Sequence, residues 1–335
     1  MASGQRLHSE AEFLRLVDRH FSNTHPHMAL GRGDDCAELV CPPLLCLTSD
    51  LFLEDVHFRT SYFSPADIGY KALAVNFSDL AAAGARPVGW NMNLMLPKNT
   101  ELDYVDAILR GMAELAGEYD APLTGGDLSR ADKLGVSITA WGAPHAGVKL
   151  LRRSGTRPGE SLFLGRSGEH GPGLARVGLF ELEAAHAAPG AESPAIRHPA
   201  AQAAHLRPRP LIELGLTLAQ AGVSSLMDLS DGLARDLPRL LGHERGEPLG
   251  AEINLDPGAL HPEVIAYATA HGLDPVREAW LGGEDYLLLG SCEQNVLEEL
   301  LAQGVNLLPL GKVTSGPEIK LNGHCPDQAG FDHFA

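Results

Sequence analysis

Apolar positions recur along the chain with two different periods, and each change of period marks a predicted element. A helical period follows Ser9, whose spacing to Glu12 is that of a capping box, and it predicts a helix that ends near residue 21. A longer helix is predicted from Pro65 to about residue 83, because Pro is well tolerated at the first helical position. Further helices are expected at 102–119 and 211–221, and another follows a glycine-rich turn within 165–173.

Short apolar runs bounded by turn residues predict the strands. They lie at 44–48, 91–96, 134–141, 161–164 and 286–289. Strands that alternate with helices indicate an α/β fold or a fold of mixed α+β layers.

The pattern also indicates how the chain is divided. It pauses around residues 144–147, so we expect two domains, 1–146 and 147–335. Residues 186–210 are rich in Ala, Pro and His, and this composition predicts a surface excursion.

Composition narrows the class of protein. The 335 residues are 44% hydrophobic and 21% charged, which is typical of a globular protein. The formal net charge of −17 argues against a general nucleic-acid or anionic-membrane surface, since either partner needs a basic face. No apolar run approaches the roughly 20 residues of a membrane span, and the N-terminus lacks a signal-peptide core, so we expect a cytoplasmic protein. The 5 cysteines lack C-x-x-C spacing and favour reduced thiols over a zinc site.

Short acidic motifs recur at or near the apolar runs. They are Gly33-Asp34-Asp35, Thr48-Ser49-Asp50, Phe77-Ser78-Asp79, Gly125-Gly126-Asp127, Met227-Asp228-Leu229-Ser230-Asp231-Gly232 and Gly282-Gly283-Glu284-Asp285. Carboxylates gathered in one place repel one another unless a cation joins them, and Mg2+ takes oxygen ligands together with substrate phosphates. The chain has neither a P-loop nor a dinucleotide-binding fingerprint nor protein-kinase motifs. A nucleotide would therefore be held through metal ions.

Single residues in these motifs also have ordinary explanations. Asp79 lies in an apolar helix and could pair with Lys71, although an ionised carboxylate there is costly to bury without a partner. Asp231 could cap the helix that follows it. A loop aspartate often closes a turn, which applies to Asp35, Asp50 and Asp127. The recurrence of the motif favours ligand roles for the whole set.

Three further features suit a phosphate ligand. Gly126 lacks Cβ and so permits close approach of the backbone to a phosphate. Arg152 and Arg153 offer guanidinium groups for phosphate, although such a pair is equally common on an ordinary surface. His57, taken alone, is more often a plain surface or core histidine.

In order and spacing, these motifs resemble those of the thiamine-monophosphate kinase family. Its superfamily also contains aminoimidazole ribonucleotide synthetase and selenophosphate synthetase. The matching stretches are Gly33-Asp34-Asp35-Cys36-Ala37, Thr48-Ser49-Asp50, Val56-His57-Phe58, the run from Tyr70 to Ala85, Gly125-Gly126-Asp127, Arg153-Ser154-Gly155, Met227 to Leu233, Gly282 to Tyr286 and Gly330-Phe331-Asp332-His333-Phe334. The resemblance spans nearly the whole chain.

The resemblance implies a fold, a reaction and a set of site residues. The implied fold is a two-domain, aminoimidazole ribonucleotide synthetase-like α/β fold whose N-terminal sheet pairs across a homodimer, and the implied reaction converts ATP and thiamine monophosphate to ADP and thiamine diphosphate. It implies Mg2+ ligands at Asp35, Thr48, Ser49, Asp50, Asp79, Asp127, Asp228 and Asp231, of which Asp50, Asp79, Asp127, Asp228 and Asp231 form the catalytic set. It implies ATP contacts at Gly126, Asp127, Arg153 and Ser230. It implies thiamine-phosphate contacts at His57, Glu284 and Phe331.

Two alternatives stay open at this stage. A different ATP-dependent enzyme of the same superfamily, of the purine-pathway synthetase type, would turn over ATP with another acceptor. A non-catalytic metal- or nucleotide-binding protein would bind Mg2+ and ATP without turnover, although it would have no need for so many mutually repelling carboxylates.

Overall fold

The computed structural model describes residues 5–186, 197–246 and 248–326, so the predicted substrate contact Phe331 lies outside the described residues. The chain divides into two compact units. Unit 1 comprises Met1–Leu80 and Ala85–His145, and unit 2 comprises Ala81–Gly84 and Ala146–Ala335. Both units combine helices with a β-sheet, which confirms the predicted α/β fold of mixed layers.

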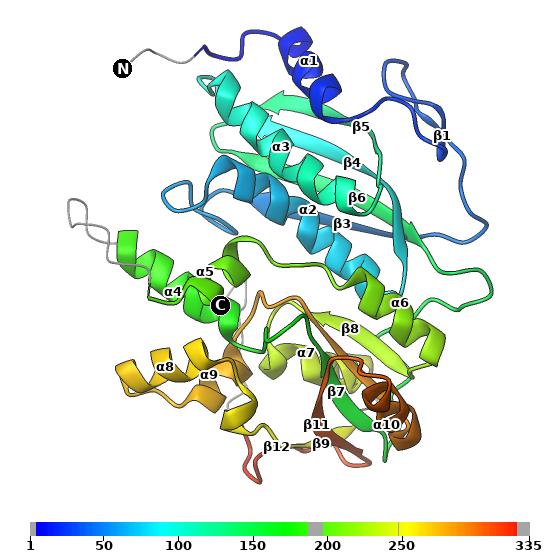
Figure 1. Ribbon diagram of the computed structural model, residues 1–335, viewed down its shortest axis with the longest axis vertical. Helices are drawn as coiled ribbons and strands as arrows, with labels where there is room; N and C mark the ends of the chain where they lie inside the picture. Colours follow the sequence, from blue (N-terminus) through cyan, green and yellow to red (C-terminus); the bar gives the residue numbers. More distant parts are fainter. Residues whose placement is uncertain (1–4, 187–196, 247, 327–335) are drawn as a thin grey trace. The chain divides into compact units, whose positions relative to one another are not determined.

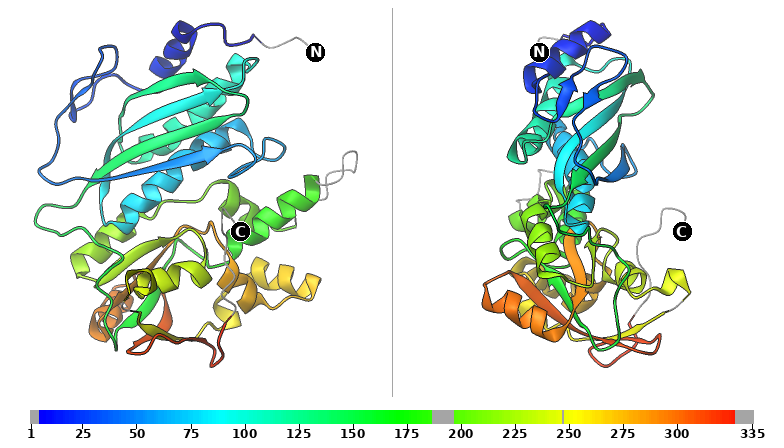
Figure 2. Two further views of the ribbon diagram at one scale, coloured as in Figure 1. Left: turned by 180° about the vertical axis from the view of Figure 1, so that it is seen from behind. Right: turned by 90° about the vertical axis from the view of Figure 1, so that its right-hand side faces the viewer.

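Unit 1 is built on a four-stranded sheet with the order β3-β6-β4-β5. Its strands are β3 (Cys46–Leu53), β4 (Arg86–Leu96), β5 (Leu123–Arg130) and β6 (Gly135–Ala143). β6 is antiparallel to both β3 and β4, and β4 is parallel to β5. The helices α2 (Pro65–Ala82) and α3 (Leu102–Glu118) lie on one face of the sheet in Figure 1, and Figure 2 shows the opposite face without a helix over it.

Local sequence explains where the helices of unit 1 begin and end. α1 (Glu10–His20) begins after Ser9, whose side chain accepts a hydrogen bond from the backbone N–H of Glu12, as the capping-box spacing predicts. α2 begins at Pro65, as predicted, and most of its residues are buried, which suits a predominantly apolar helix. A two-stranded hairpin of β1 (Met28–Leu30) and β2 (Glu38–Leu39) completes the unit.

Unit 2 is built on a six-stranded sheet with the order β12-β9-β11-β7-β10-β8. Its strands are β7 (Ser161–Gly165), β8 (Ser225–Leu229), β9 (Gly250–Ile253), β10 (Leu287–Cys292), β11 (Leu307–Thr314) and β12 (Ile319–Leu321). Neighbouring strands are antiparallel except for β12 and β9, which are parallel.

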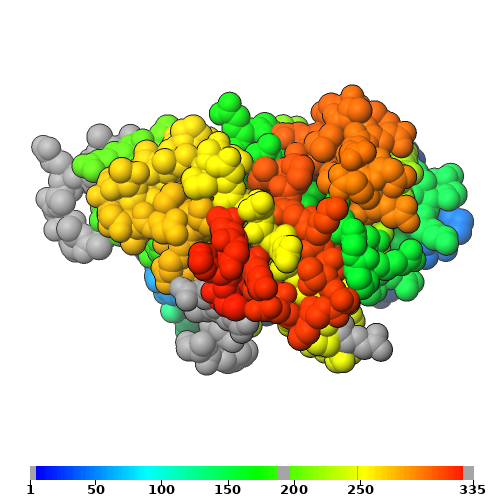
Figure 3. Space-filling model, turned by 90° about the horizontal axis from the view of Figure 1, so that it is seen from below, coloured from blue at the N-terminus to red at the C-terminus, as the bar shows by residue number. Residues whose placement is uncertain are grey.

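The helices of unit 2 cover its sheet. They are α4 (Leu174–His186), α5 (Pro199–Leu206), α6 (Ile212–Ala221), α7 (Leu233–Leu240), α8 (Pro262–His271), α9 (Pro275–Leu281) and α10 (Gln294–Ala302), with short 3-10 turns at His243–Arg245 and Pro257–Ala259. The main apolar core joins α4, α5, α7, α8 and α9 to the strands. Figure 3 shows α8 and α9 in yellow and gold on one side of the sheet's surface and α10 in orange on the other.

The structure corrects two expectations. The strand predicted at 44–48 runs from Cys46 to Leu53, so Asp50 lies within the strand and not after its end. The described part of the 186–210 excursion contains α5, in which Ala201, Ala204 and His205 are buried. Among the described residues, no helix is both long enough and apolar enough to cross a membrane.

Candidate active site

A pair of carboxylates from β3 and α2 forms the centre of the candidate site in unit 1. Side chains alternate along a strand, so Thr48, Asp50 and Phe52 point to one face of β3. The Thr48 hydroxyl donates a hydrogen bond to Oδ2 of Asp79 on α2. Burial raises the pKa of Asp50 to about 6, and the nearby Asp79 carboxylate adds to the rise. The fold therefore holds two mutually repelling carboxylates, Asp50 and Asp79, in a partly buried environment.

The donor atoms around this pair fit a hard cation. Asn76 lies one helical turn before Asp79, and its amide nitrogen donates to the carbonyl of Ala72. The Asn76 Oδ1 atom is buried without a hydrogen-bond partner among the described residues. Carboxylate, hydroxyl and amide oxygens are the ligands that Mg2+ takes in proteins. Within the same residues, however, no group of three or more His, Cys, Asp and Glu side chains is arranged to hold a metal ion.

Two predicted ligands of unit 1 lie away from the pair. Ser49 and Asp50 point to opposite faces of β3, because side chains alternate along a strand. The Ser49 hydroxyl donates to the carbonyl of Ile138, so only the Ser49 backbone could contribute a ligand on the Asp50 face. Across the sheet, Asp50 is paired with Ile138, Ile138 with Met92, and Met92 with Gly126. Asp127 is exposed and belongs to the next row of paired residues. Three strand spacings separate β3 from β5, or about 14 Å. A single chain therefore does not bring Asp127 or the Ser49 hydroxyl to the pair.

Gly126 is needed by the sheet itself. Its φ of +151° is rarely adopted by other residues, and a Cβ there would lie 1.7 Å from the carbonyl oxygen of Met92. Packing within the sheet is therefore sufficient to explain a glycine at position 126, whether or not its backbone also approaches a phosphate.

His57 lies against the same face of β3 as Asp50. Its ring stacks on Phe52 at a centroid distance of 5.9 Å. The backbone N–H of Leu53 donates to His57 Nδ1 at 3.1 Å, so Nδ1 carries no proton and the neutral ring bears its proton on Nε2. The hydrogen bond to Nδ1 and the stacking on Phe52 together orient the imidazole ring.

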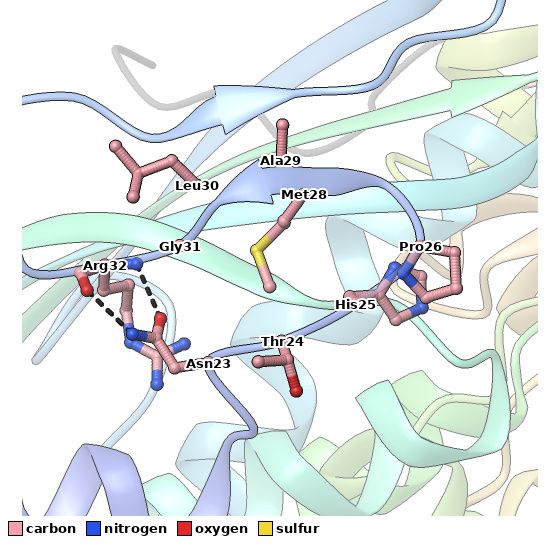
Figure 4. A pocket seen from close by; sticks show the side chains of 9 residues that line it. All are labelled: Asn23, Thr24, His25, Pro26, Met28, Ala29, Leu30, Gly31 and Arg32. Atoms are coloured by element: carbon pink, nitrogen blue, oxygen red, sulfur yellow. Dashed lines mark hydrogen bonds between the residues drawn. The ribbon is translucent and has the colours of Figure 1, made fainter.

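The loop that carries Asp35 is exposed but firmly attached at its start. Figure 4 shows two hydrogen bonds between the Asn23 side chain and the backbone of Arg32, which measure 2.6 and 2.7 Å. They lie beside an open hollow of about 580 Å³ that is lined by residues 23–26 and 28–32. The Arg32 side chain is only 11% exposed, and its guanidinium group donates to the carbonyl of Leu123, at the start of β5, at 2.7 Å. It also contacts Asp18 and the carbonyls of Phe21 and Ser22. Arg32 therefore links the Asp35 loop to the strand that carries Asp127.

In unit 2, the predicted residues cluster where β8 leads into α7. Asp228 is buried near the end of β8, and Ser230 and Asp231 follow the strand. Gly232, with a φ of +96°, is the N-cap of α7, so Asp231 does not cap the helix. The Asp231 carboxylate instead pairs with Arg239 at 2.6 Å. A cation at this carboxylate would have to share it with, or displace, that guanidinium.

Three glycine-containing turns pack backbone to backbone around this cluster. A Cβ on Gly232 would lie 2.6 Å from the carbonyl oxygen of Gly282, and one on Gly282 would lie 2.5 Å from Cα of Gly173. A Cβ on Gly283 would approach the carbonyl oxygen of Ser230 at 2.9 Å. The turns beside β7, β8 and β10 therefore form one closely packed group, and Glu284 belongs to it.

Asp285 was named from the sequence in an acidic motif but was assigned no role, and Asp236 was not singled out. Asp285 is buried and accepts the backbone N–H groups of Gly173 at 2.6 Å and Ala175 at 2.9 Å, which fixes the start of α4. Asp236 accepts the N–H of Asp231, and burial raises its pKa to about 6. The adjacency of Asp285 to Glu284 was a usable signal, but nothing in the sequence paired Asp236 or Arg239 with Asp231.

The candidate nucleotide contact Arg153 is exposed. Its backbone carbonyl lies 3.5 Å from Nη2 of Arg245, and the carbonyl of Arg152 accepts the N–H of Leu226 on β8 at 2.9 Å. The segment is thus attached to the β8 strand while the Arg153 side chain remains available to solvent.

Comparison with known proteins identifies the family to which this chain belongs. Residues 33–143 match the family model described as AIR synthase related protein, N-terminal domain. The chain is 31% identical over 303 residues to a thiamine-monophosphate kinase of Aquifex aeolicus, covering 90% of this chain and 92% of that protein. It is 33% identical over 342 residues to the thiamine-monophosphate kinase of Escherichia coli K12, covering 96% and 97%. The chain belongs to the thiamine-monophosphate kinase family.

Solved structures agree. The thiamine-monophosphate kinase of Stenotrophomonas maltophilia K279a superimposes with a TM-score of 0.79 at 26% identity, over 96% of this chain and 100% of that one. AaThiL complexed with AMPPCP and TMP gives a TM-score of 0.75 at 26% identity, over 97% of each chain. The hydrogenase maturation protein HypE in complex with ATP gives 0.69 at 19% identity, a likeness of fold alone.

Proposed function

We propose that this protein transfers the γ-phosphoryl group of ATP to thiamine monophosphate and releases ADP and thiamine diphosphate. The observation that carries the proposal in the structure is the Asp50–Asp79 pair, with Thr48 and the buried Asn76 oxygen beside it. Family membership supports thiamine monophosphate as the acceptor, because the chain matches thiamine-monophosphate kinases over nearly their whole length.

We assign the site residues to three groups. The Mg2+ ligands are Asp35, Thr48, Ser49, Asp50, Asp79, Asp127, Asp228 and Asp231. The ATP contacts are Gly126, Asp127, Arg153 and Ser230. The contacts to thiamine monophosphate are His57, Glu284 and Phe331. We assign metal binding, ATP binding and dimerisation to domain 1–146 and completion of the site to domain 147–335.

In this reaction the site residues have to position the two substrates and to hold the metal ions that neutralise their negative charge. The nucleophile is a phosphate oxygen of thiamine monophosphate, already ionised near neutral pH, so no side chain has to remove a proton from it. Bound Mg2+ would supply charge neutralisation for the two anionic substrates. The chain contributes the oxygen ligands that retain the metal, and His57 contributes an oriented N–H donor for a phosphate. Catalysis is then positioning and electrostatics without a covalent intermediate.

We also propose a homodimer formed through the open face and β3 edge of the unit 1 sheet. β3 is an edge strand, and its outward residues Leu47 and Leu51 are 69% and 55% exposed. A long edge strand with exposed leucines is an aggregation hazard unless a partner covers it.

The proposal is tested by incubating the purified protein with ATP, MgCl2 and thiamine monophosphate and separating the products by chromatography. We expect thiamine diphosphate that requires Mg2+ and is lost in Asp50→Asn. ATP hydrolysis that ignores thiamine monophosphate but responds to another acceptor would replace the proposal with a sister enzyme. Binding of Mg2+ and ATP without turnover on any acceptor would indicate a non-catalytic protein.

A further inference from the structure

A buried histidine on α5 contacts the partly exposed carboxylate of Glu284. The His205 side chain is 2% exposed and its Nδ1 lies 2.9 Å from Oε2 of Glu284, whose side chain is 30% exposed. α5 comes from the Ala/Pro/His-rich segment for which the sequence offered no role, and its Ala201 and Ala204 are buried in the core of unit 2. The imidazole is thus held by the core and reaches outward to the turn beside β10.

Glu284 is placed by its backbone as well. Its φ is +64°, in the left-handed region that non-glycine residues seldom adopt. Its N–H donates to the carbonyl of Ser230 at 2.6 Å, which ties the turn to the β8–α7 loop. Local strain of this kind persists only where the surroundings enforce it. Backbone and side chain are therefore fixed by separate contacts.

We propose that His205 is a positioning residue that holds the Glu284 carboxylate for the cationic thiazolium ring of thiamine monophosphate, and that it sets selectivity for a cationic acceptor. The inference rests on the proposed function, because it takes Glu284 as a substrate contact. A long acidic side chain loses rotamer freedom when it binds a ligand, and a contact that fixes it beforehand removes that cost from the binding step. A carboxylate is also the group that a permanent cation attracts.

The same helix offers a matched control. His198 is the N-cap residue of α5, and its Nδ1 lies 2.5 Å from Oε1 of Glu181 on α4. This histidine–glutamate pair is also largely buried, but neither residue belongs to the proposed site. His198→Leu therefore removes a comparable contact from the same helix without touching Glu284.

The experiment compares His205→Leu, His205→Asn, Glu284→Gln, the double variant His205→Leu/Glu284→Gln and the control His198→Leu. Leucine suits a buried position but cannot pair with a carboxylate, whereas the asparagine amide places an N–H near the position of Nδ1. The acceptors are thiamine monophosphate and its deaza analogue, in which the five-membered ring is neutral. The readouts are kcat, KM for each acceptor, KM for ATP, and the melting temperature.

We expect His205→Leu to raise KM for thiamine monophosphate about tenfold, with kcat and KM for ATP within twofold. His205→Asn restores most of the affinity, and the neutral analogue shows no such loss. The double variant is no worse than Glu284→Gln alone, since both substitutions remove one shared interaction. His198→Leu lowers the melting temperature without changing KM.

Different failures have different signatures. No thiamine diphosphate from the unmodified protein overturns the proposed function itself. An unchanged KM in Glu284→Gln removes the carboxylate from the substrate site, and the role of His205 with it. A raised KM in Glu284→Gln with an unchanged KM in His205→Leu overturns the His205 proposal alone. Equal losses with the cationic and neutral acceptors, or in His198→Leu, would assign the histidine to stability instead.

Discussion

At the scale of single residues, the candidate site contains carboxylates that lower the stability of the folded state. Asp50 and Asp79 repel each other in a partly buried place, and burial raises the pKa of Asp50 to about 6 from 3.8. A carboxyl whose pKa is higher in the folded state destabilises that state once it ionises, so this contribution works against folding at neutral pH. Such a cost is typical of catalytic positions.

Asp50→Asn should therefore stabilise the metal-free protein while abolishing its activity. A rise of about two pKa units corresponds to an upper limit of about 3 kcal/mol, and partial solvation leaves an expected gain of about 1 kcal/mol. Turnover should fall at least about a hundredfold, because a proposed ligand of the metal is lost. Thermal melting in the presence of EDTA and the product assay measure the two effects. A variant that melts lower than the parent without metal would contradict this account.

The sequence revealed the acids that stand in repeated motifs, but not the partners that hold them. Asp50 and Asp79 were found because a carboxylate in an apolar run needs a reason to be there. Asp231 was expected as a ligand or an N-cap, and its pairing with Arg239 depends on the turn at Gly232, which no local pattern encodes. His205 was invisible because its partner Glu284 is distant in the sequence.

At the scale of elements, helices were easier to predict than strands. α2 and α3 begin at Pro65 and Leu102, where the apolar period and the start signals agree. β3 extends beyond its apolar run because Ser49 and Leu51 face the open side of the sheet, where burial does not constrain the pattern. α5 was missed because an eight-residue helix that carries histidines gives a weak periodic signal.

β5 depends on the absence of a side chain at Gly126. Gly126→Ala should cost about 3 kcal/mol or prevent folding, since its Cβ would meet the Met92 carbonyl at 1.7 Å and its φ is +151°. A Cβ on Gly117 in α3 would have no atom within 4 Å, so Gly117→Ala should be neutral or stabilising by up to about 1 kcal/mol. Urea unfolding of the two variants tests the contrast, and equal stabilities would refute it.

The hairpin of β1 and β2 is joined to β5 through Arg32. Arg32→Met should cost about 2–4 kcal/mol, because its partly buried donors satisfy several carbonyls at once, including that of Leu123. Arg19, which is 64% exposed and pairs with Asp106 at 2.8 Å, provides the matched surface control, and Arg19→Met should cost less than about 1 kcal/mol.

Arg32→Met should also raise the Mg2+ concentration needed for half-maximal activity, since the loop carrying Asp35 loses its anchor. An unchanged Mg2+ requirement would separate this loop from the metal site.

At the scale of the whole molecule, the unit 1 sheet leaves one face without a covering helix among the described residues in Figure 2. Within a single chain, Asp127 lies in a different row of the sheet from Asp50. Val88, Trp141 and Ala143 form a small apolar cluster that Leu45 packs against, close in the sheet register to the exposed Leu47. An isologous dimer would cover this surface with a copy of itself.

Charges introduced on the outward face of β3 should therefore separate the subunits. In a dimer with twofold symmetry, Leu47→Glu/Leu51→Glu places like charges on both copies of the interface, and such juxtaposition costs several kcal/mol. Sedimentation analysis should show a dimer for the parent and a monomer for this variant. Leu14→Glu is the matched control, because Leu14 is 55% exposed like Leu51 but lies on α1, and it should remain dimeric. A parent protein that sediments as a monomer at micromolar concentration would refute the dimer. A parent and a β3 variant that both sediment as dimers would place the interface elsewhere.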